Sequence, residues 1–222
     1  MRRFECSAII FDLDGVLVDS AAYVEQQWRR WASARGLRAE PFLRVCHGRR
    51  AVETIRLAAP HLDAEAEVAA FDPVEEPETA TIGPLAGAAR LLELLPRESW
   101  GVATSGPRSA AVARLRRAAL PVPRVLVCAE DVSRGKPHPD AYLLAAARLQ
   151  AAPADCLVLE DAPAGVQAAR GAGMPVVGVA TTHRPDQLPA DAVAASLAGV
   201  FLGRVDCAAP GKRRLEILVV EP

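Results

Sequence analysis

The chain has 222 residues, of which 51% are hydrophobic and 24% are charged, and its formal net charge is −1. This length fits one large domain or a domain with a smaller insertion, and the balance of residues is that of a globular protein rather than a disordered one. The near-zero charge and the lack of a dense Lys/Arg run argue against nucleic acid or a membrane surface as the main partner, so we expect a small-molecule partner.

The sequence carries no sign of membrane insertion or export. No apolar run approaches the roughly 18 residues that a membrane-spanning helix needs, and the first ten residues, MRRFECSAII, lack the hydrophobic region of a signal peptide. The five cysteines are scattered without metal-ligand spacing, and their odd number fits a reducing compartment better than a disulfide framework. We therefore expect a cytoplasmic protein, present as a monomer or weak dimer.

The first predicted strand, residues 7–11, is followed by a stretch without strand signals, residues 18–84. Val24, Trp28 and Trp31 fall on one face of a helix that begins near Ser20, and we assign the two tryptophans to packing. The stretch is too long for a simple loop, so we predict an inserted small helical domain that ends in a Pro-rich, acidic linker, DPVEEPETATIGP. Two further helices are expected within it, over residues 49–58 and over part of residues 64–71.

After this stretch, short apolar runs alternate with helical segments. Runs so rich in Val, Ile and Leu are typical of strands buried on both faces, and their alternation with helices implies a parallel sheet covered on both sides. We predict an α/β fold, a doubly wound parallel sheet with a Rossmann-like core. The expected helices are residues 87–95, 108–118, 140–149 and 163–172, and the expected strands are residues 100–104, 125–128, 156–160 and 175–179.

The chain closes with RRLEILVVEP, preceded by APGK. This pattern predicts a hairpin whose turn contains Pro210 and Gly211 and whose second strand pairs at the edge of a sheet. The segment carries no evident chemistry.

Polar side chains follow four of the predicted strands, at the sheet edge where α/β proteins bind ligands. Taken singly, each has an ordinary structural explanation, because aspartates and hydroxyls cap helices or form turns and a loop lysine is usually solvated. Independent capping does not require two acid pairs, a hydroxyl and a lysine at one edge, so their joint occurrence favours a site. The residues are Asp12 and Asp14, then Thr104 and Ser105 in TSG, Lys136 in RGKPHPD, and Glu160 and Asp161 in EDAPAG.

These residue types together indicate phosphoryl transfer. Clustered carboxylates repel one another, and a cation relieves the cost. Ligands that are all oxygens select a hard ion, so Mg²⁺ is the expected cofactor. A carboxylate nucleophile, a divalent ion, a lysine and a hydroxyl are the parts that position and neutralise a phosphoryl group.

The motifs DLDGVLVDS, ATSG, GKPHPD and EDAPAGVQAARGAGM, in this order and spacing, closely resemble the four motifs of the haloacid dehalogenase-like hydrolase superfamily. The resemblance spans essentially the whole chain. The inserted helices resemble the small cap of the branch that holds sugar phosphatases, β-phosphoglucomutase and phosphoglycolate phosphatase, and the cap stretch HGRRAVETI is most similar to the sugar-phosphate and glycerol-3-phosphate phosphatases. The resemblance implies a catalytic core over residues 1–17 and 85–222, and a helical cap over residues 18–84.

The resemblance also implies roles for the two aspartates and the metal ligands. Asp12 is the nucleophile that forms an aspartyl-phosphate, and Asp14 is first the general acid and then the base that activates water. Mg²⁺ is held by the Asp12 carboxylate, the Asp14 backbone carbonyl and Asp161, with Glu160 nearby or acting through water.

The other matching residues contact the substrate or support the nucleophile. Thr104, with the backbone N–H groups of Ser105 and Gly106, holds the phosphoryl oxygens, and Lys136 orients Asp12 and offsets negative charge.

In the cap stretch, His47, Gly48 and Arg49 are expected substrate contacts, and Arg50 less so, since they lie where a helix begins. Solvated arginines and a packed histidine remain the structural alternatives.

The sequence therefore predicts a Mg²⁺-dependent phosphatase that acts on small phosphorylated sugars or polyols. The alternative is a sugar phosphomutase of the β-phosphoglucomutase type, which uses the same core but returns the phosphoryl group to a bound sugar bisphosphate. A phospho-accepting receiver uses similar residues in a different chain order, and a binding protein without catalysis is disfavoured because none of the expected catalytic groups is missing.

Overall fold

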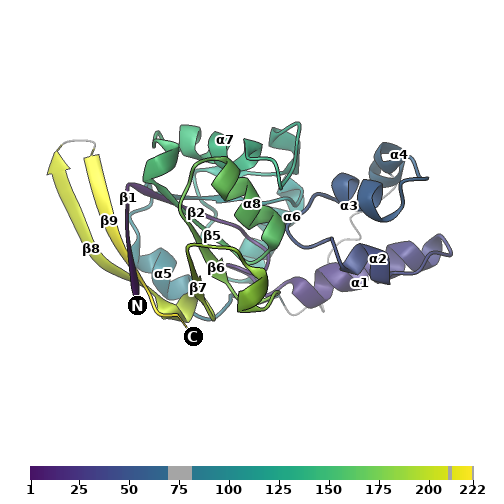
Figure 1. Cartoon of the computed structure of the whole chain (residues 1–222), viewed down its shortest axis with the longest axis horizontal. Coiled ribbons are helices and arrows are strands. Elements are labelled where there is room, and N and C mark those ends of the chain that lie inside the picture. Colours follow the sequence, from purple (N-terminus) through teal and green to yellow (C-terminus); the bar gives the residue numbers. More distant parts are fainter. Residues whose placement is uncertain (70–81, 210–211, 222) are drawn as a thin grey trace.

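A parallel sheet of six strands forms the centre of the molecule (Figure 1) in the computed structural model, which describes residues 1–69, 82–209 and 212–221. The strand order β4-β3-β2-β5-β6-β7 places β2 in the interior of the sheet, and every neighbouring pair is parallel. The predicted α/β fold is confirmed. The strands are β2 (Ala8–Phe11), β3 (Trp100–Ala103), β4 (Leu126–Val127), β5 (Cys156–Glu160), β6 (Val176–Val179) and β7 (Ala192–Ala194).

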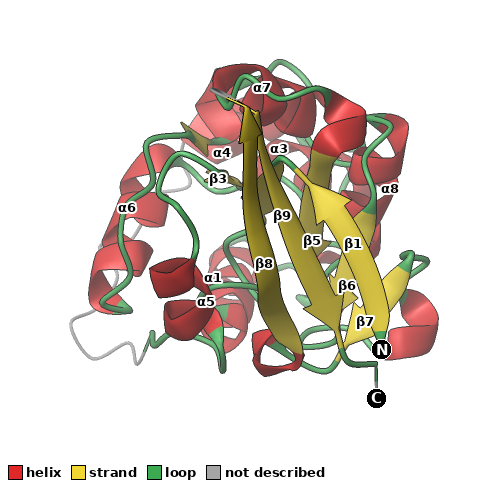
Figure 2. Ribbon diagram, turned by 90° about the vertical axis from the view of Figure 1, so that its left-hand side faces the viewer, coloured by secondary structure: helices red, strands yellow, loops and turns green. Residues whose placement is uncertain are grey.

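Helices cover both faces of this sheet, because its strands are apolar on both sides. In β2, Ile9 and Phe11 belong to one hydrophobic cluster, whereas Ala8 and Ile10 belong to the other, as the alternation of side chains along a strand requires. Helices α5 and α6 pack on the first cluster, and α7 and α8 on the second (Figure 2). Their bounds are α5 (Ala88–Leu94), α6 (Arg108–Arg117), α7 (Asp140–Arg148) and α8 (Pro163–Gly171), each within one residue of the predicted helix at both ends.

Between β2 and α5 the described residues form four helices, which we call the helical insertion. They surround a hydrophobic cluster of their own, in which the ring of Phe42 stacks on Trp28 at 5.6 Å between centroids and meets Trp31 edge-on at 5.0 Å. Both tryptophans are buried, as predicted. The insertion lies at one end of the molecule, beyond the sheet (Figure 1). It comprises α1 (Ala21–Ala34), α2 (Glu40–Leu43), α3 (Ala51–Ala58) and α4 (Ala64–Ala69).

One helix of the insertion was not predicted, and the structure does not test the predicted linker or domain boundaries. Helix α2 was not expected, since four residues are too few to show a helical period. The predicted linker, residues 72–84, lies mostly outside the described residues. The division of the chain at residues 17/18 and 84/85 stays a prediction.

A second, three-stranded antiparallel sheet has the order β1-β9-β8 (Figure 2). The predicted hairpin is formed by β8 (Val200–Ala209) and β9 (Lys212–Val219), and its expected turn, Pro210 and Gly211, lies outside the described residues. The prediction that the second strand pairs at an edge was wrong, because β1 (Arg2–Cys6) pairs with the other side of β9 and makes it the central strand.

Short 3₁₀ turns link several of these elements. They are η1 (Ala129–Asp131), η2 (Pro153–Asp155), η3 (Pro185–Gln187) and η4 (Leu197–Gly199). Across the described residues, no helix combines the length and the apolar character that crossing a bilayer requires.

The ring cluster of the insertion gives a test of its packing. Phe42→Ala removes a side chain that is 2% exposed, so the free energy of unfolding should fall by about 3–5 kcal/mol, as measured by chemical denaturation. Leu57→Ala, at a position on α3 that is 59% exposed, is the control and should change it by less than about 0.5 kcal/mol. Equal effects of the two substitutions would contradict this description of the cluster.

Candidate active site

The carboxyl ends of three neighbouring strands bring the predicted polar residues together. Strands β3, β2 and β5 are adjacent in the sheet, and Asp12, Thr104 and Asp161 follow their last residues. Lys136 joins them from the loop between β4 and α7, and Glu160 is the last residue of β5. All five side chains are buried, so what stands at this edge is an enclosed polar cluster and not a set of surface charges.

Lys136 links two of the carboxylates. Its Nζ lies 2.5 Å from Asp12 Oδ1 and 2.7 Å from Glu160 Oε1, and the residue is 1% exposed. The hydroxyl of Tyr142, on α7, donates to the same Glu160 oxygen at 3.0 Å. Tyr142 was missed by sequence reasoning, because its place in the helix made it one more apolar core residue. Its one signal in the sequence is its position six residues after Lys136, just beyond the motif GKPHPD.

The charges of this cluster do not balance. Asp12, Glu160 and Asp161 are three buried carboxylates against the single ammonium of Lys136, so the cluster carries −2 when all of them are ionised. Burial, only partly opposed by Lys136, raises the pKa of Asp12 to about 7, and burial together with Glu160 raises the pKa of Asp161 well above its ordinary value. Burial by itself would lower the pKa of Lys136, but Asp12 and Glu160 outweigh it and raise that pKa well above its usual range. The lysine is therefore held as a cation, but its single positive charge does not neutralise all three carboxylates.

The donor set fits a divalent cation. One oxygen from each of Asp12, Glu160 and Asp161 lies within 4.8 Å of the others. Among the described residues, Asp161 Oδ1 is buried and has no hydrogen-bond partner, as expected of an atom that awaits a ligand. Both Glu160 oxygens already have partners, since Oε2 accepts the Ala162 N–H at 2.8 Å. Asp12 and Asp161 are thus the carboxylates best able to bind an ion directly.

The side chain of Asp14 lies outside this carboxylate cluster. Asp14 Oδ1 accepts hydrogen bonds from Ser20 Oγ at 2.5 Å and from Arg114 Nη1 at 2.7 Å. Arg114 lies on α6, is 8% exposed and was missed by sequence reasoning, because it stands 100 residues from Asp14 with no shared motif. Gly15 has φ +80°, and a Cβ there would come within 2.3 Å of Asp161 Oδ2, so glycine allows this turn to approach the Asp161 carboxylate.

The TSG loop after β3 has one internal hydrogen bond and one hydrogen bond to the helical insertion. The N–H of Gly106 donates to Thr104 Oγ1 at 3.0 Å, and Ser105 Oγ donates to the carbonyl of Gly48 at 2.9 Å. Gly48 has φ +73°, and a Cβ there would lie 2.8 Å from Cβ of Ala162, which follows Asp161. The insertion therefore contacts the core at the loops that carry Thr104 and Asp161.

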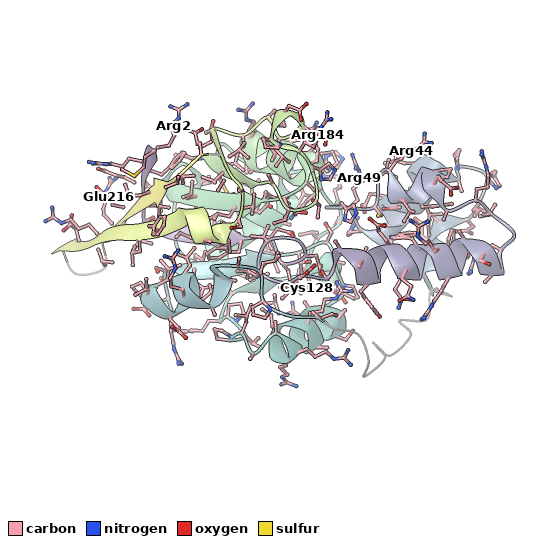
Figure 3. All side chains as sticks on the ribbon, turned by 90° about the horizontal axis from the view of Figure 1, so that it is seen from below. Arg2, Arg44, Arg49, Cys128, Arg184 and Glu216 are labelled. Atoms are coloured by element: carbon pink, nitrogen blue, oxygen red, sulfur yellow. The ribbon has the colours of Figure 1, made fainter. Side chains whose placement is uncertain are left out.

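The other predicted insertion residues lie at the same junction. His47 is half-buried, with Nε2 3.6 Å from Glu25 Oε1, and its ring meets that of His183 edge-on at 6.0 Å. Arg49 Nη1 donates to the carbonyl of Val45 at 3.1 Å, and its buried Nε has no partner within the described residues. Figure 3 shows Arg49 where the insertion faces the core. The structure thus brings His47, Gly48 and Arg49 to the edge of the predicted site.

The fold and this cluster define an α/β protein with an acidic site at the strand ends, whose carboxylates could hold a metal ion, and a helical insertion that contacts the neighbouring loops. The family model for haloacid dehalogenase-like hydrolases matches residues 6–173, so the chain belongs to the haloacid dehalogenase-like hydrolase family, as its motifs predict. Enzymes of this family typically use a divalent metal.

Similar proteins include phosphatases. Hexitol phosphatase A of Escherichia coli is 44% identical over 179 residues, which cover 78% of this chain and 83% of that protein. Validoxylamine A 7'-phosphate phosphatase of Streptomyces hygroscopicus subsp. limoneus is 40% identical over 190 residues, 81% of this chain and 88% of that protein. The crystal structure of a hydrolase from Pseudomonas syringae is 28% identical, with a TM-score of 0.78 over 86% of this chain and 94% of that chain.

The space around Glu160 provides a test of the cluster. A Cβ at Gly165, on α8, would stand 1.6 Å from Glu160 Oε1, so Gly165→Ala must displace this carboxylate from Lys136 and Tyr142. We expect the free energy of unfolding to fall by about 2–5 kcal/mol in chemical denaturation. On the same helix, Gly171→Ala is the control: its Cβ would meet nothing closer than 3.8 Å, and its effect should stay within about 0.5 kcal/mol. A Gly165→Ala protein as stable as the control would show that Glu160 is not fixed in this way.

Proposed function

We propose that this chain is a Mg²⁺-dependent phosphatase that hydrolyses small phosphorylated sugars or polyols through an aspartyl-phosphate on Asp12. The observation that carries the proposal is the buried Asp12 carboxylate, which Lys136 holds through Oδ1 beside the cation-binding oxygens. The hydrogen bond from Lys136 to Oδ1 fixes the carboxylate and leaves its other oxygen, Oδ2, to attack phosphorus.

In the first step, Asp12 Oδ2 forms a bond to phosphorus while the bond from phosphorus to the ester oxygen breaks. Asp14 donates a proton to the departing alkoxide, which leaves as the alcohol. In the second step, Asp14 takes a proton from water as the water oxygen attacks phosphorus, and the Asp12 carboxylate is released with inorganic phosphate. Lys136 keeps the orientation of Asp12 through both steps and offsets negative charge.

The different surroundings of the two aspartates fit these different tasks. Asp12 is enclosed with the other carboxylates, whereas Asp14 is half-buried and held by Ser20 and Arg114. Although only one residue separates them, Lys136 holds Asp12 beside Glu160, while Ser20 and Arg114 hold Asp14 near the TSG loop. There Asp14 Oδ2 would lie 3.8 Å from a Cβ at Gly106. Two acids with separate environments are the arrangement that acid–base chemistry requires.

Mg²⁺ is the ion that the donor chemistry favours, because every available ligand is an oxygen. Asp12, Asp161 and the backbone carbonyl of Asp14 would hold it. Glu160 would not bind the ion directly, because its carboxylate accepts hydrogen bonds from Lys136 and Tyr142. When bound, the ion supplies positive charge that neutralises the carboxylates and the phosphoryl oxygens.

The phosphoryl oxygens are bound by the TSG loop. The Thr104 hydroxyl donates to one of them, together with the N–H groups of Ser105 and Gly106. The Gly106 N–H donates to Thr104 Oγ1 in this structure, so the proposed contact requires it to turn toward the phosphoryl group.

Substrate choice falls to the junction with the insertion. His47, Gly48 and Arg49 stand there, and Arg49 has a buried Nε without a described partner that can donate to a hydroxyl or an anion. The similarity to a hexitol phosphatase supports a phosphorylated polyol or sugar as the small-molecule partner. A cytoplasmic location is supported by the four described cysteines, which are free and buried, and we retain a monomer or weak dimer as the assembly.

Replacement of the nucleophile tests the reaction. Asp12→Asn should lower the turnover number for phosphate release at least about a thousandfold, because an amide oxygen does not form the aspartyl-phosphate. The measurement is inorganic phosphate released from hexitol, glycerol and sugar phosphates, with thermal melting as the check on folding. Turnover close to that of the unsubstituted enzyme would remove Asp12 from this role. An isomerised sugar phosphate in place of free phosphate would identify a phosphomutase instead.

Metal binding should stabilise the protein more at high pH than at low pH. Without metal, the pKa of Asp12 is raised from 3.8 to about 7, so its contribution to stability is present below pH 3.8 and is lost as the pH rises toward 7. Mg²⁺ binds the ionised carboxylates and offsets this loss, by about 2.7 kcal/mol at 100 times its dissociation constant. The melting temperature should therefore rise with MgCl₂ at pH 8 and hardly at all at pH 5. Asp161→Asn should abolish the rise, and a rise of equal size at both pH values would contradict the assignment.

A further inference from the structure

Arg50, the residue before α3, reaches from the helical insertion to the core. Its Nη1 donates to the carbonyls of Val132 at 2.8 Å and Ala129 at 3.3 Å, and its Nη2 donates to the carbonyl of Ser133 at 2.8 Å. The side chain is 13% exposed. A planar guanidinium can serve three carbonyls at once, whereas a lysine ammonium at the same place lacks this fork. Arg50 therefore binds several carbonyl groups of one core segment, residues 129–135.

Glu53, on α3, completes the contact. Both of its carboxylate oxygens lie 2.9 Å from Arg50 Nε, and its Oε1 accepts the backbone N–H of Gly135 at 3.1 Å. A Cβ at Gly135 would lie 2.7 Å from Arg50 Nε and 2.9 Å from Glu53 Oε2, so a larger residue would push the pair away. The segment is thus shaped to receive both side chains from the insertion.

The segment that this pair holds leads directly to Lys136. Gly135 is the residue before it, and the Lys136 ammonium is what fixes Asp12 and Glu160. On its other side the lysine is surrounded by core residues, since it is 1% exposed and its Nζ lies 4.7 Å from the centre of the Tyr142 ring. The backbone just before the lysine is therefore anchored from the insertion, while its side chain is anchored in the core.

We propose that Arg50 and Glu53 are positioning residues that form a latch between the insertion and the core and place Lys136 when the insertion is seated. Docking of the insertion and alignment of the nucleophile are then coupled. The backbone groups that bind the pair, on Ala129, Val132, Ser133 and Gly135, belong to the segment that leads to Lys136, and Lys136 holds Asp12. The activity part of this inference rests on the proposed phosphatase function, whereas the latch itself does not.

Hydrogen–deuterium exchange of the full chain without substrate tests the latch directly. In Arg50→Met and Glu53→Ala, the amides of residues 129–136 should exchange about tenfold faster or more. Local opening of the segment in the unsubstituted protein must break the hydrogen bonds to Arg50 and Glu53, and the variants lack them. Glu53→Gln keeps an acceptor for the Gly135 N–H and should give an intermediate exchange rate. This milder variant still tests the latch if the larger changes impair folding. The matched control is Arg56→Met, on the same helix, whose exposed pair with Glu65 stays within the insertion; its exchange rate should equal that of the unsubstituted protein. Unchanged exchange in Glu53→Ala and Glu53→Gln would overturn the latch.

Phosphate release tests the positioning role. Arg50→Met and Glu53→Ala should lower kcat about 10- to 100-fold with less than a threefold change in KM, Arg50→Lys should recover part of the loss, and Arg56→Met should match the unsubstituted enzyme. Faster exchange with an unchanged kcat would show that the latch does not place Lys136 and would overturn that part. If the unsubstituted protein releases phosphate from no ester, the proposed function fails, and the exchange comparison still decides the latch.

Discussion

The ammonium of Lys136 between the buried carboxylates of Asp12 and Glu160 is the interaction on which the site depends. Removing three carboxylates from water is costly unless positive charge and hydrogen bonds replace the solvent. The lysine replaces part of it, while Tyr142 and the Ala162 N–H serve the remaining Glu160 lone pairs. The deficit that remains is −2, a charge that a divalent cation would neutralise. The absence of a side chain at Gly165 leaves the room that this arrangement needs.

The same chain segment holds two acids in two environments. Asp12 shares the enclosed cluster with Glu160 and Asp161, whereas Asp14, two residues further along, accepts hydrogen bonds from Ser20 and Arg114. In the proposed reaction this separation lets one carboxylate attack phosphorus while the other handles protons. Ser20 also precedes α1, the first helix of the insertion, so the resting position of the acid depends on where the insertion begins.

The helical insertion has its own hydrophobic cluster but also contacts the core closely. Its aromatic cluster around Phe42 is separate from the two clusters of the core, which lets it pack as a unit. It nevertheless contacts three core loops that carry predicted site residues, through Gly48 to Ser105 and Ala162, and through the Arg50–Glu53 pair to the segment before Lys136. In the proposed reaction, the catalytic groups of the core would thereby lie next to the residues of the insertion that select the substrate.

The sequence by itself determined the α/β class, the four helices and five of the strands of the core, the inserted helices and the polar residues at the strand ends, because these features have strong local patterns. It did not predict β1, β7 or α2, which are too short or too polar to show one, and it misplaced β9, whose central position depends on a strand from the other end of the chain. Only the tertiary structure decided the partners of the site: Arg114 for Asp14 and Glu53 for Gly135 come from segments 100 and 82 residues away. Local periodicity contains no record of such pairings, because they arise when distant segments meet at one sheet edge.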